Sequence, residues 1–188
     1  AQLRDQSADL AVGIYGELPQ EMRNRQLLTD RFVCVVRRDH PVITGRLSLE
    51  AFVRLLHVQV APRGKPGGYV DDVLRERGLK RTVARAVPYF FSALSLVSQT
   101  DYVLTISERI AKRHAAELGL RIVEAPLALR PYALSLLWHP RVDADAGPRR
   151  LSSRAPTLDR LDVAADIVHL APVFAELSDR LMAPPPGR

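Results

Sequence analysis

Residues 29–41 read TDRFVCVVRRDHP and combine a short apolar run with an abrupt polar end. The five apolar residues at 32–36 stand between charged neighbours, which is typical of a buried strand and not of one face of an amphipathic helix. Pro41 cannot donate a backbone hydrogen bond, so pairing of this strand should stop at or before it. The stretch therefore predicts a crossing point between two folding units.

The composition of the 188 residues is that of an ordinary soluble globular protein, with 47% hydrophobic and 26% charged residues. The longest apolar run is far shorter than the about 18 residues that span a bilayer, and no export signal opens the chain. A single cysteine, Cys34, excludes an internal disulfide framework. These features predict a cytoplasmic protein without a membrane partner. The net charge of +6 comes from scattered arginines, which favours solvated surface over direct nucleic-acid contact.

Strand and helix patterns alternate between this stretch and residue 131, with lengths typical of parallel strand–helix–strand crossovers. The expected strands are 57–62, 82–87, 102–105 and 120–123, and the expected helices are 48–56, 69–77, 93–97 and 107–118. Before the stretch, residues 8–14 resemble a strand of a parallel sheet that is covered on both faces. After it, residues 132–138 form a second long apolar strand, which ends in His-Pro as the first does.

The pattern predicts an α/β fold in which one lobe is inserted into another through two linking strands. The expected divisions are 1–40 with 132–150 for the first lobe, 41–131 for the second lobe, and 151–188 for a divergent tail. In the tail, stripes at 158–168 and 173–181 suggest helices, and the proline-rich end is expected to be disordered. The linking strands place the expected hinge at Val36, Arg37, Leu137 and Trp138.

The first candidate site is the segment Pro88, Tyr89 and Phe90, which follows a predicted strand. Ligands of open α/β folds bind outside the carboxyl ends of the strands, where these aromatic rings are expected. Packing of the same rings in the core or at its rim is the alternative. Gly13 and Thr105 also end predicted strands, and either is a candidate ligand contact or a simple strand end.

The second candidate site is the glycine-rich loop at 63–68, which leads into a predicted helix. Free N–H groups and the positive end of the helix dipole, with Arg63 and Gly64 beside them, suit a carboxylate. The GxxxxGK[ST] spacing of a phosphate loop is absent, and an ordinary turn explains the loop equally well.

The remaining reactive residue types do not form a catalytic or metal-binding pattern. Cys34 lies inside an apolar strand and is expected to be a buried structural thiol. His40 and His139, each before a proline, are expected to be hydrogen-bonded surface histidines. The sequence contains no GxSxG, HExxH or CxxC pattern, which predicts a protein that is not an enzyme and needs no cofactor.

The ordered set of these segments resembles the effector-binding (substrate-binding) domain of LysR-type transcriptional regulators, in the branch of nodulation activators and aromatic catabolism. The segments that carry the resemblance include DLAVG at 9–13, DRFVCVVRRDHP at 30–41, VPYF at 87–90, TDYVLT at 100–105 and WHPR at 138–141. The resemblance covers about residues 1–148 and rests on order and spacing, because no single motif is diagnostic.

The resemblance implies two Rossmann-like lobes joined by two crossing strands, as in type II periplasmic binding proteins. A small effector, often an aromatic acid, would sit in the cleft near Gly13 and Pro88–Phe90, and the protein would form dimers or tetramers. DNA would be bound by an N-terminal winged helix-turn-helix, which this chain lacks; the first lobe also lacks its opening strand, helix and second strand. A truncated, non-functional regulator and a periplasmic-type solute-binding module are the alternatives.

Overall fold

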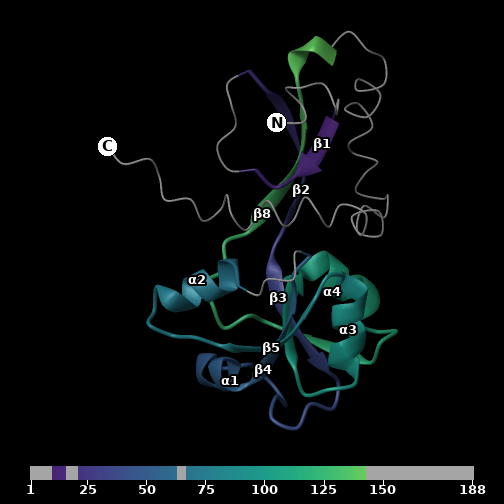
Figure 1. Cartoon of the computed structure of the whole chain (residues 1–188). Coiled ribbons are helices and arrows are strands. Elements are labelled where there is room, and N and C mark those ends of the chain that lie inside the picture. The colour runs from purple at the N-terminus through teal and green to yellow at the C-terminus, as the bar shows by residue number, and fades with distance from the viewer. Residues whose placement is uncertain (1–9, 16–20, 63–66, 143–188) are drawn as a thin grey trace. The chain divides into compact units, whose positions relative to one another are not determined.

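Figure 1 shows the computed structural model of the chain, which describes residues 10–15, 21–62 and 67–142. The chain forms two compact units: residues 1–29 and 132–188 make up unit 1, and residues 30–131 make up unit 2. The tail helices and the disordered end predicted after residue 150 lie outside the described residues, as do Arg63 and Gly64.

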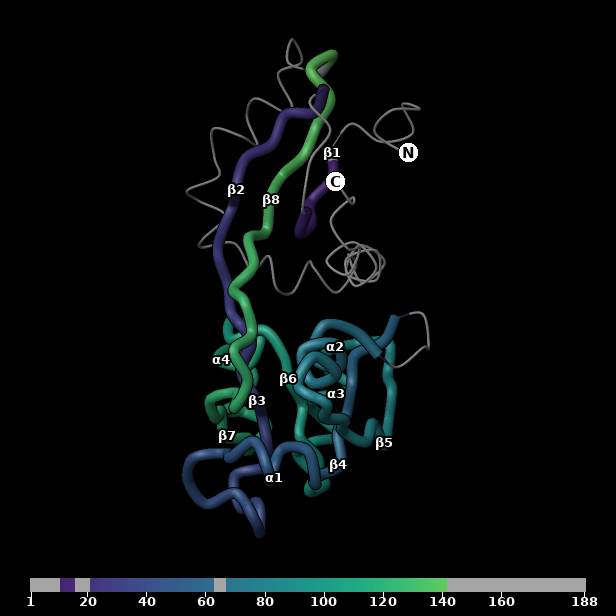
Figure 2. The backbone as a smooth tube through the Cα atoms, turned by 90° about the vertical axis from the view of Figure 1, so that its left-hand side faces the viewer, coloured from purple at the N-terminus to yellow at the C-terminus, as the bar shows by residue number. Residues whose placement is uncertain are grey.

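The described part of unit 1 is a three-stranded sheet in the order β1-β8-β2. The strands are β1 (Leu10–Gly13), β2 (Arg23–Asp30) and β8 (Tyr132–Trp138), and a short helix, η1 (Pro140–Val142), follows. Strand β1 pairs antiparallel with β8, so the prediction of a parallel neighbour at 8–14 is wrong. The reason is that an apolar run reports burial and carries no information on the direction of its partner. Figure 2 shows β2 and β8 side by side.

Strand β2 is not evident in the sequence. Its residues read RNRQLLTD, and most of their side chains are exposed or half-buried. The alternation of apolar and polar residues that marks a strand is missing from its first half. Among the described residues β2 lies at an edge of the three-stranded sheet, a position where charged side chains are tolerated.

Unit 2 is built on a five-stranded sheet in the order β5-β4-β6-β3-β7. Its strands are β3 (Phe32–Arg37), β4 (Leu56–Val60), β5 (Thr82–Val87), β6 (Val103–Ser107) and β7 (Leu120–Val123). Its helices are α1 (Leu49–Arg54), α2 (Tyr69–Arg75), α3 (Phe90–Ser98) and α4 (Glu108–His114). Strand β4 runs parallel to β5 and β6, whereas β3 is antiparallel to β6 and β7. The predicted alternation of strands and helices is confirmed.

Strand β3 lies at the centre of the hydrophobic core of unit 2. Val33, Cys34, Val35 and Val36 have no exposed surface. Because side chains alternate along a strand, Cys34 and Val36 join the cluster around Phe52 on the α1 and α2 side. The two other valines face the opposite side, which α3 and α4 cover (Figure 1). Burial of both faces is the outcome that the unbroken apolar run predicts.

The ends of the helices follow the predicted capping residues. The Oγ atoms of Ser48 and Ser107 accept the backbone N–H three residues further on, at 3.1 and 3.4 Å, and so begin α1 and α4. Gly78 follows α2 with a φ of +67°, a left-handed conformation that favours glycine.

The boundary between the units differs from the predicted one at residue 40. The division falls at 29–30, because β3 is paired on both sides within the sheet of unit 2. The chain therefore crosses between the units at 29–30 and again at 131–132. The residues predicted as hinge lie inside strands, away from these two crossings: Val36, Arg37, Leu137 and Trp138. The hinge itself stays a prediction.

His40 is buried, with 3% of its surface exposed, so its prediction as a surface histidine is wrong. Its Nδ1 accepts the N–H groups of the residues two and three positions on, at 3.2 and 3.1 Å. The proton is therefore on Nε2, which donates to the Asp101 carbonyl oxygen at 3.0 Å. His40 thus fixes the turn after β3 to the loop before β6, a long-range contact that the local His-Pro pair does not reveal.

Candidate functional site

The carboxyl ends of three parallel strands meet at one edge of the unit 2 sheet. Val60 of β4 lies opposite Val87 of β5, and the Ala61 N–H donates to the Val87 carbonyl oxygen at 2.8 Å. Strand β6, parallel to β4 on its other side, ends at Ser107, and the antiparallel β3 begins beside it, with Phe32 opposite Ser107. We call this the carboxyl edge: residues 30–32, 61–62, 88–90 and 105–107. It is the place where open α/β sheets bind ligands.

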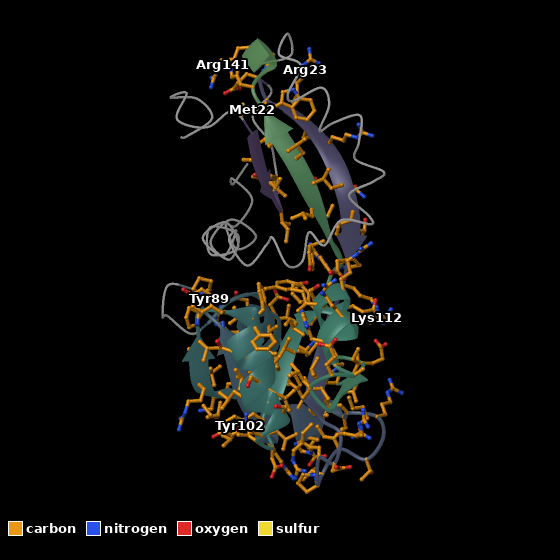
Figure 3. The ribbon with its side chains drawn as sticks, turned by 90° about the vertical axis from the view of Figure 1, so that its right-hand side faces the viewer. Met22, Arg23, Tyr89, Tyr102, Lys112 and Arg141 are labelled. Carbon is orange, nitrogen blue, oxygen red and sulfur yellow. The ribbon has the colours of Figure 1, made fainter. Side chains whose placement is uncertain are left out.

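Pro88, Tyr89 and Phe90 lie on the carboxyl edge, where the sequence predicts them. Tyr89 is 52% exposed, Pro88 is also exposed, and Phe90 is half-buried. Tyr89 precedes the first turn of α3 with extended backbone, at a φ of −123°. Figure 3 shows it at the opposite end of unit 2 from Tyr102, which precedes β6. An exposed ring beside the strand ends offers an apolar face to a planar ligand.

Thr105 also lies on the carboxyl edge, but its hydroxyl already has a partner. Its Oγ1 is 3.6 Å from the Sγ of Cys34 on the neighbouring strand β3. Burial raises the pKa of the Cys34 thiol to about 12, and the contact with Thr105 opposes this shift. Cys34 is therefore a protonated structural thiol, as predicted.

The glycine-rich loop is described from Gly67 onward, and Gln59 of β4 holds it. The Nε2 of Gln59 donates to the Gly67 carbonyl oxygen at 2.6 Å, and its Oε1 accepts the Gly67 N–H at 3.1 Å. Gly67 and Gly68 have φ values of +116° and +145°, which side chains rarely adopt. The carboxylate contact predicted for Arg63 and Gly64 falls outside the described residues and stays a prediction.

The sequence does not reveal a buried carboxylate on the carboxyl edge. Asp30 is 8% exposed, and it accepts hydrogen bonds from the Ser107 hydroxyl and, at 2.8 Å, from the Arg31 N–H. Because Ser107 also caps α4, one hydroxyl joins the first residue of unit 2 to β6 and α4. In the sequence Asp30 has the pattern of an ordinary polar residue before a strand, so only the fold shows its partner.

Arg31 joins α4 to the end of β7 by ion pairs. Its guanidinium donates to Glu124 at 2.6 and 2.9 Å and to Glu108 at 3.1 and 2.7 Å. These bonds raise the pKa of Arg31 and lower the pKa of both carboxyls. Arg31 and Glu124 are exposed, so the network fixes positions and adds little stability.

Tyr69, the first residue of α2, is a further contact that the sequence does not reveal. Its ring centroid is 5.9 Å from that of Phe32, at an interplanar angle of 43°. Its hydroxyl oxygen accepts the backbone N–H of Arg130 at 2.6 Å. The half-buried Tyr69 therefore contacts residues near the start and the end of unit 2.

Gly13 lies in unit 1, where it is buried opposite Ser135 of β8, and its predicted ligand contact stays a prediction. The described residues also line two hollows away from the carboxyl edge. One, of about 540 Å³, is lined by residues 46–49 and 125–127 of unit 2, and the other, of about 520 Å³, by residues 21–24, Trp138 and Pro140 of unit 1. Neither includes a residue predicted to bind ligand.

Within the described ranges, no three His, Cys, Asp or Glu side chains are placed to hold a metal ion. No helix in that part of the chain is long and apolar enough to cross a membrane.

The chain forms two units connected by two chain crossings, and unit 2 is an α/β unit whose strand ends meet at the carboxyl edge. Residues 1–152 match the LysR substrate binding domain, and the chain belongs to this family.

Relatives and a solved structure agree with this assignment. The chain is 37% identical over 144 residues to the HTH-type transcriptional regulator SyrM of Rhizobium meliloti (strain 1021), covering 76% of this chain and 44% of SyrM. It is 34% identical over 141 residues to the HTH-type transcriptional activator NagR of Ralstonia sp, covering 75% and 47%. The chain thus spans about half the length of these curated relatives.

The crystal structure of the regulatory domain of MexT, a transcriptional activator in Pseudomonas aeruginosa, matches with a TM-score of 0.69 and 29% identity, covering 81% of this chain and 74% of that one. The predicted family, its nodulation and aromatic-catabolism branch and its α/β fold are confirmed.

Proposed function

We propose that the chain is the ligand-sensing domain of a LysR-type transcriptional regulator, and that its effector is a small aromatic carboxylic acid. The observation that carries the proposal is the exposed ring of Tyr89, beside Pro88 and the ends of three parallel strands. A planar ligand gains about 25 cal/mol for each Å² of apolar surface that it buries against such a ring. The relatives named above, which are transcriptional regulators, support the regulatory role.

The preference for a carboxylate rests on hydrogen-bond donors near the carboxyl edge. The hydroxyl oxygen of Tyr69 accepts the Arg130 N–H, which leaves its O–H to donate. A bond from a phenol to a carboxylate is charge-assisted and stronger than a neutral one. Arg63 stays the predicted second partner, and the net charge of +6 favours anions in general.

We also propose that the domain acts in the cytoplasm within a larger, oligomeric regulator that binds DNA. The relatives are about twice as long as the matched segment, which leaves room for other domains in such proteins. In the described residues a strand separates each α helix from the next, so no helix-turn-helix lies among them. DNA contacts would then come from another part of the regulator.

Isothermal titration calorimetry tests the effector class directly. The probes are benzoate, 4-hydroxybenzoate and phenylacetate, with benzamide as the neutral analogue of benzoate. We expect at least one acid to bind, and the amide of benzoate to bind at least about tenfold more weakly, because a hydrogen bond to a charged group is worth about 1.5–3 kcal/mol. A chain that binds none of the acids contradicts the proposed effector class.

The variant Tyr89→Ala tests the location of the site. It should weaken binding of the acid about tenfold, because one aromatic contact is lost. Phe91→Ala is the matched control: Phe91 is 57% exposed and its ring packs edge-on against His114 of α4, with the centroids 6.1 Å apart. The control should bind as the wild-type chain does. Equal loss in both variants would mean that the ligand does not contact Tyr89 specifically.

A further inference from the structure

Tyr69 contacts the two segments by which the chain enters and leaves unit 2. The unit begins at residue 30 and ends at residue 131. Phe32 lies just after the first crossing, and its ring is 5.9 Å from the ring of Tyr69. Arg130 lies just before the second crossing, and its backbone N–H donates to the Tyr69 hydroxyl oxygen at 2.6 Å. One side chain of α2 therefore joins segments that are far apart in the sequence.

The two crossings are held differently. At the first crossing, Asp30 accepts from Ser107, and the Glu108 N–H donates to the Arg31 carbonyl oxygen at 2.9 Å, so this segment is attached to β6 and α4. At the second crossing, Pro131 has no N–H, which makes the Arg130 N–H the last backbone donor before the chain leaves the unit. The bond to Tyr69 therefore fixes the backbone at that point.

We propose that Tyr69 is the positioning residue that joins the two crossings and transmits ligand binding to the second one. Among the described residues the Tyr69 hydroxyl is bonded only as an acceptor, so its O–H is available to a carboxylate. A phenol that donates becomes a better acceptor, because consecutive hydrogen bonds polarise one another. A ligand carboxylate at Tyr69 would thus strengthen the bond to Arg130. This ligand step rests on the proposed function, whereas the joining of the crossings does not.

Amide hydrogen exchange by NMR, on the full 188-residue chain without ligand, tests whether Tyr69 joins the two crossings. Tyr69→Phe keeps the ring against Phe32 and removes the acceptor. The Arg130 amide should then exchange about fivefold faster, the factor expected for loss of one ordinary hydrogen bond. Tyr102→Phe is the matched control, because Tyr102 is half-buried and lies at the end of unit 2 opposite Tyr89 (Figure 3). Equal Arg130 rates in all three chains would overturn the proposal.

The same measurement with saturating benzoate, or whichever acid of the panel binds, tests the ligand step. Binding should slow exchange of the Arg130 amide about twofold in the wild-type chain, through the strengthened bond. In Tyr69→Phe, ligand should leave this rate unchanged. Slowing that persists in Tyr69→Phe would overturn transmission through Tyr69. If no acid binds the wild-type chain, the ligand step fails together with the proposed function. The exchange rates without ligand still decide whether Tyr69 joins the two crossings.

Discussion

His57 is a fully buried histidine of β4 whose protonation should oppose folding. Its Nε2 donates to the Phe52 carbonyl oxygen at 2.7 Å, and its ring packs edge-on against Phe52, with the centroids 4.5 Å apart. Its Nδ1 is buried and has no hydrogen-bond partner among the described residues. A second proton on Nδ1 would therefore have no acceptor. Burial lowers the pKa of His57 from 6.5 to about 4, and the bond to Phe52 opposes this shift only in part.

The sign of the pH dependence follows from the lowered pKa. The unfolded chain binds this proton at a higher pH than the folded chain does, so acid favours unfolding. The contribution of His57 to stability is fully present above the unfolded pKa of 6.5 and is lost as the pH falls through the folded value of about 4. Between about pH 7.5 and 4.5, these two pKa values give a loss of about 2.5 kcal/mol in the free energy of unfolding.

The variant His57→Gln isolates this loss, because glutamine offers an N–H to the Phe52 carbonyl but does not titrate. We expect urea unfolding, followed by far-ultraviolet circular dichroism at both pH values, to show about 2.5 kcal/mol less acid destabilisation in the variant than in the wild-type chain. Carboxylates titrate in both chains and cancel in the difference. His114→Gln, at a half-buried position of α4, is the matched control for a histidine substitution. Identical acid losses in wild type and His57→Gln would refute the reasoning.

Two further predictions concern the same unit. Ser107→Ala should lower the free energy of unfolding, measured in urea, by about 2–3 kcal/mol, because it removes a helix cap and a donor to the buried carboxylate of Asp30. Ser48→Ala removes a helix cap alone and should lower this free energy by about 1 kcal/mol. Equal losses would show that the bond to Asp30 adds nothing. Cys34 should resist iodoacetamide in the native chain at neutral pH and react in urea, because burial holds the pKa of its thiol at about 12. Fast labelling of the native chain, detected by mass spectrometry, would contradict this.

The sequence predicts best where a local pattern decides the structure. Strands β5 and β8 begin and end at the predicted residues. Their ends are evident in the sequence because a proline follows each strand closely. The helices that begin after Ser48 and Ser107 have their expected caps. Cys34 is buried because its neighbours on both sides are apolar. On the carboxyl edge, Pro88, Tyr89 and Phe90 could be placed from the same logic of strand ends.

The features that the sequence does not show depend on partners distant in the chain. Strand β2 has a polar sequence and becomes a strand because β8 lies beside it. The boundary between the units is set by the pairing of β3 with β6 and β7, which no local pattern encodes. Asp30 and Tyr69 look like ordinary surface residues until the fold brings Ser107 and Arg130 to them.

The central position of β3 has a consequence for synthesis on the ribosome. Cys34 lies next to Thr105, which is 71 residues later in the chain, so the most apolar strand of unit 2 is made long before its partner. At about 5–20 residues per second, the nascent strand waits for about 4–14 s with its apolar side chains unpaired. Unit 2 can complete its sheet only after Val123 has left the exit tunnel. During this interval the exposed apolar side chains of β3 make the nascent chain prone to aggregation.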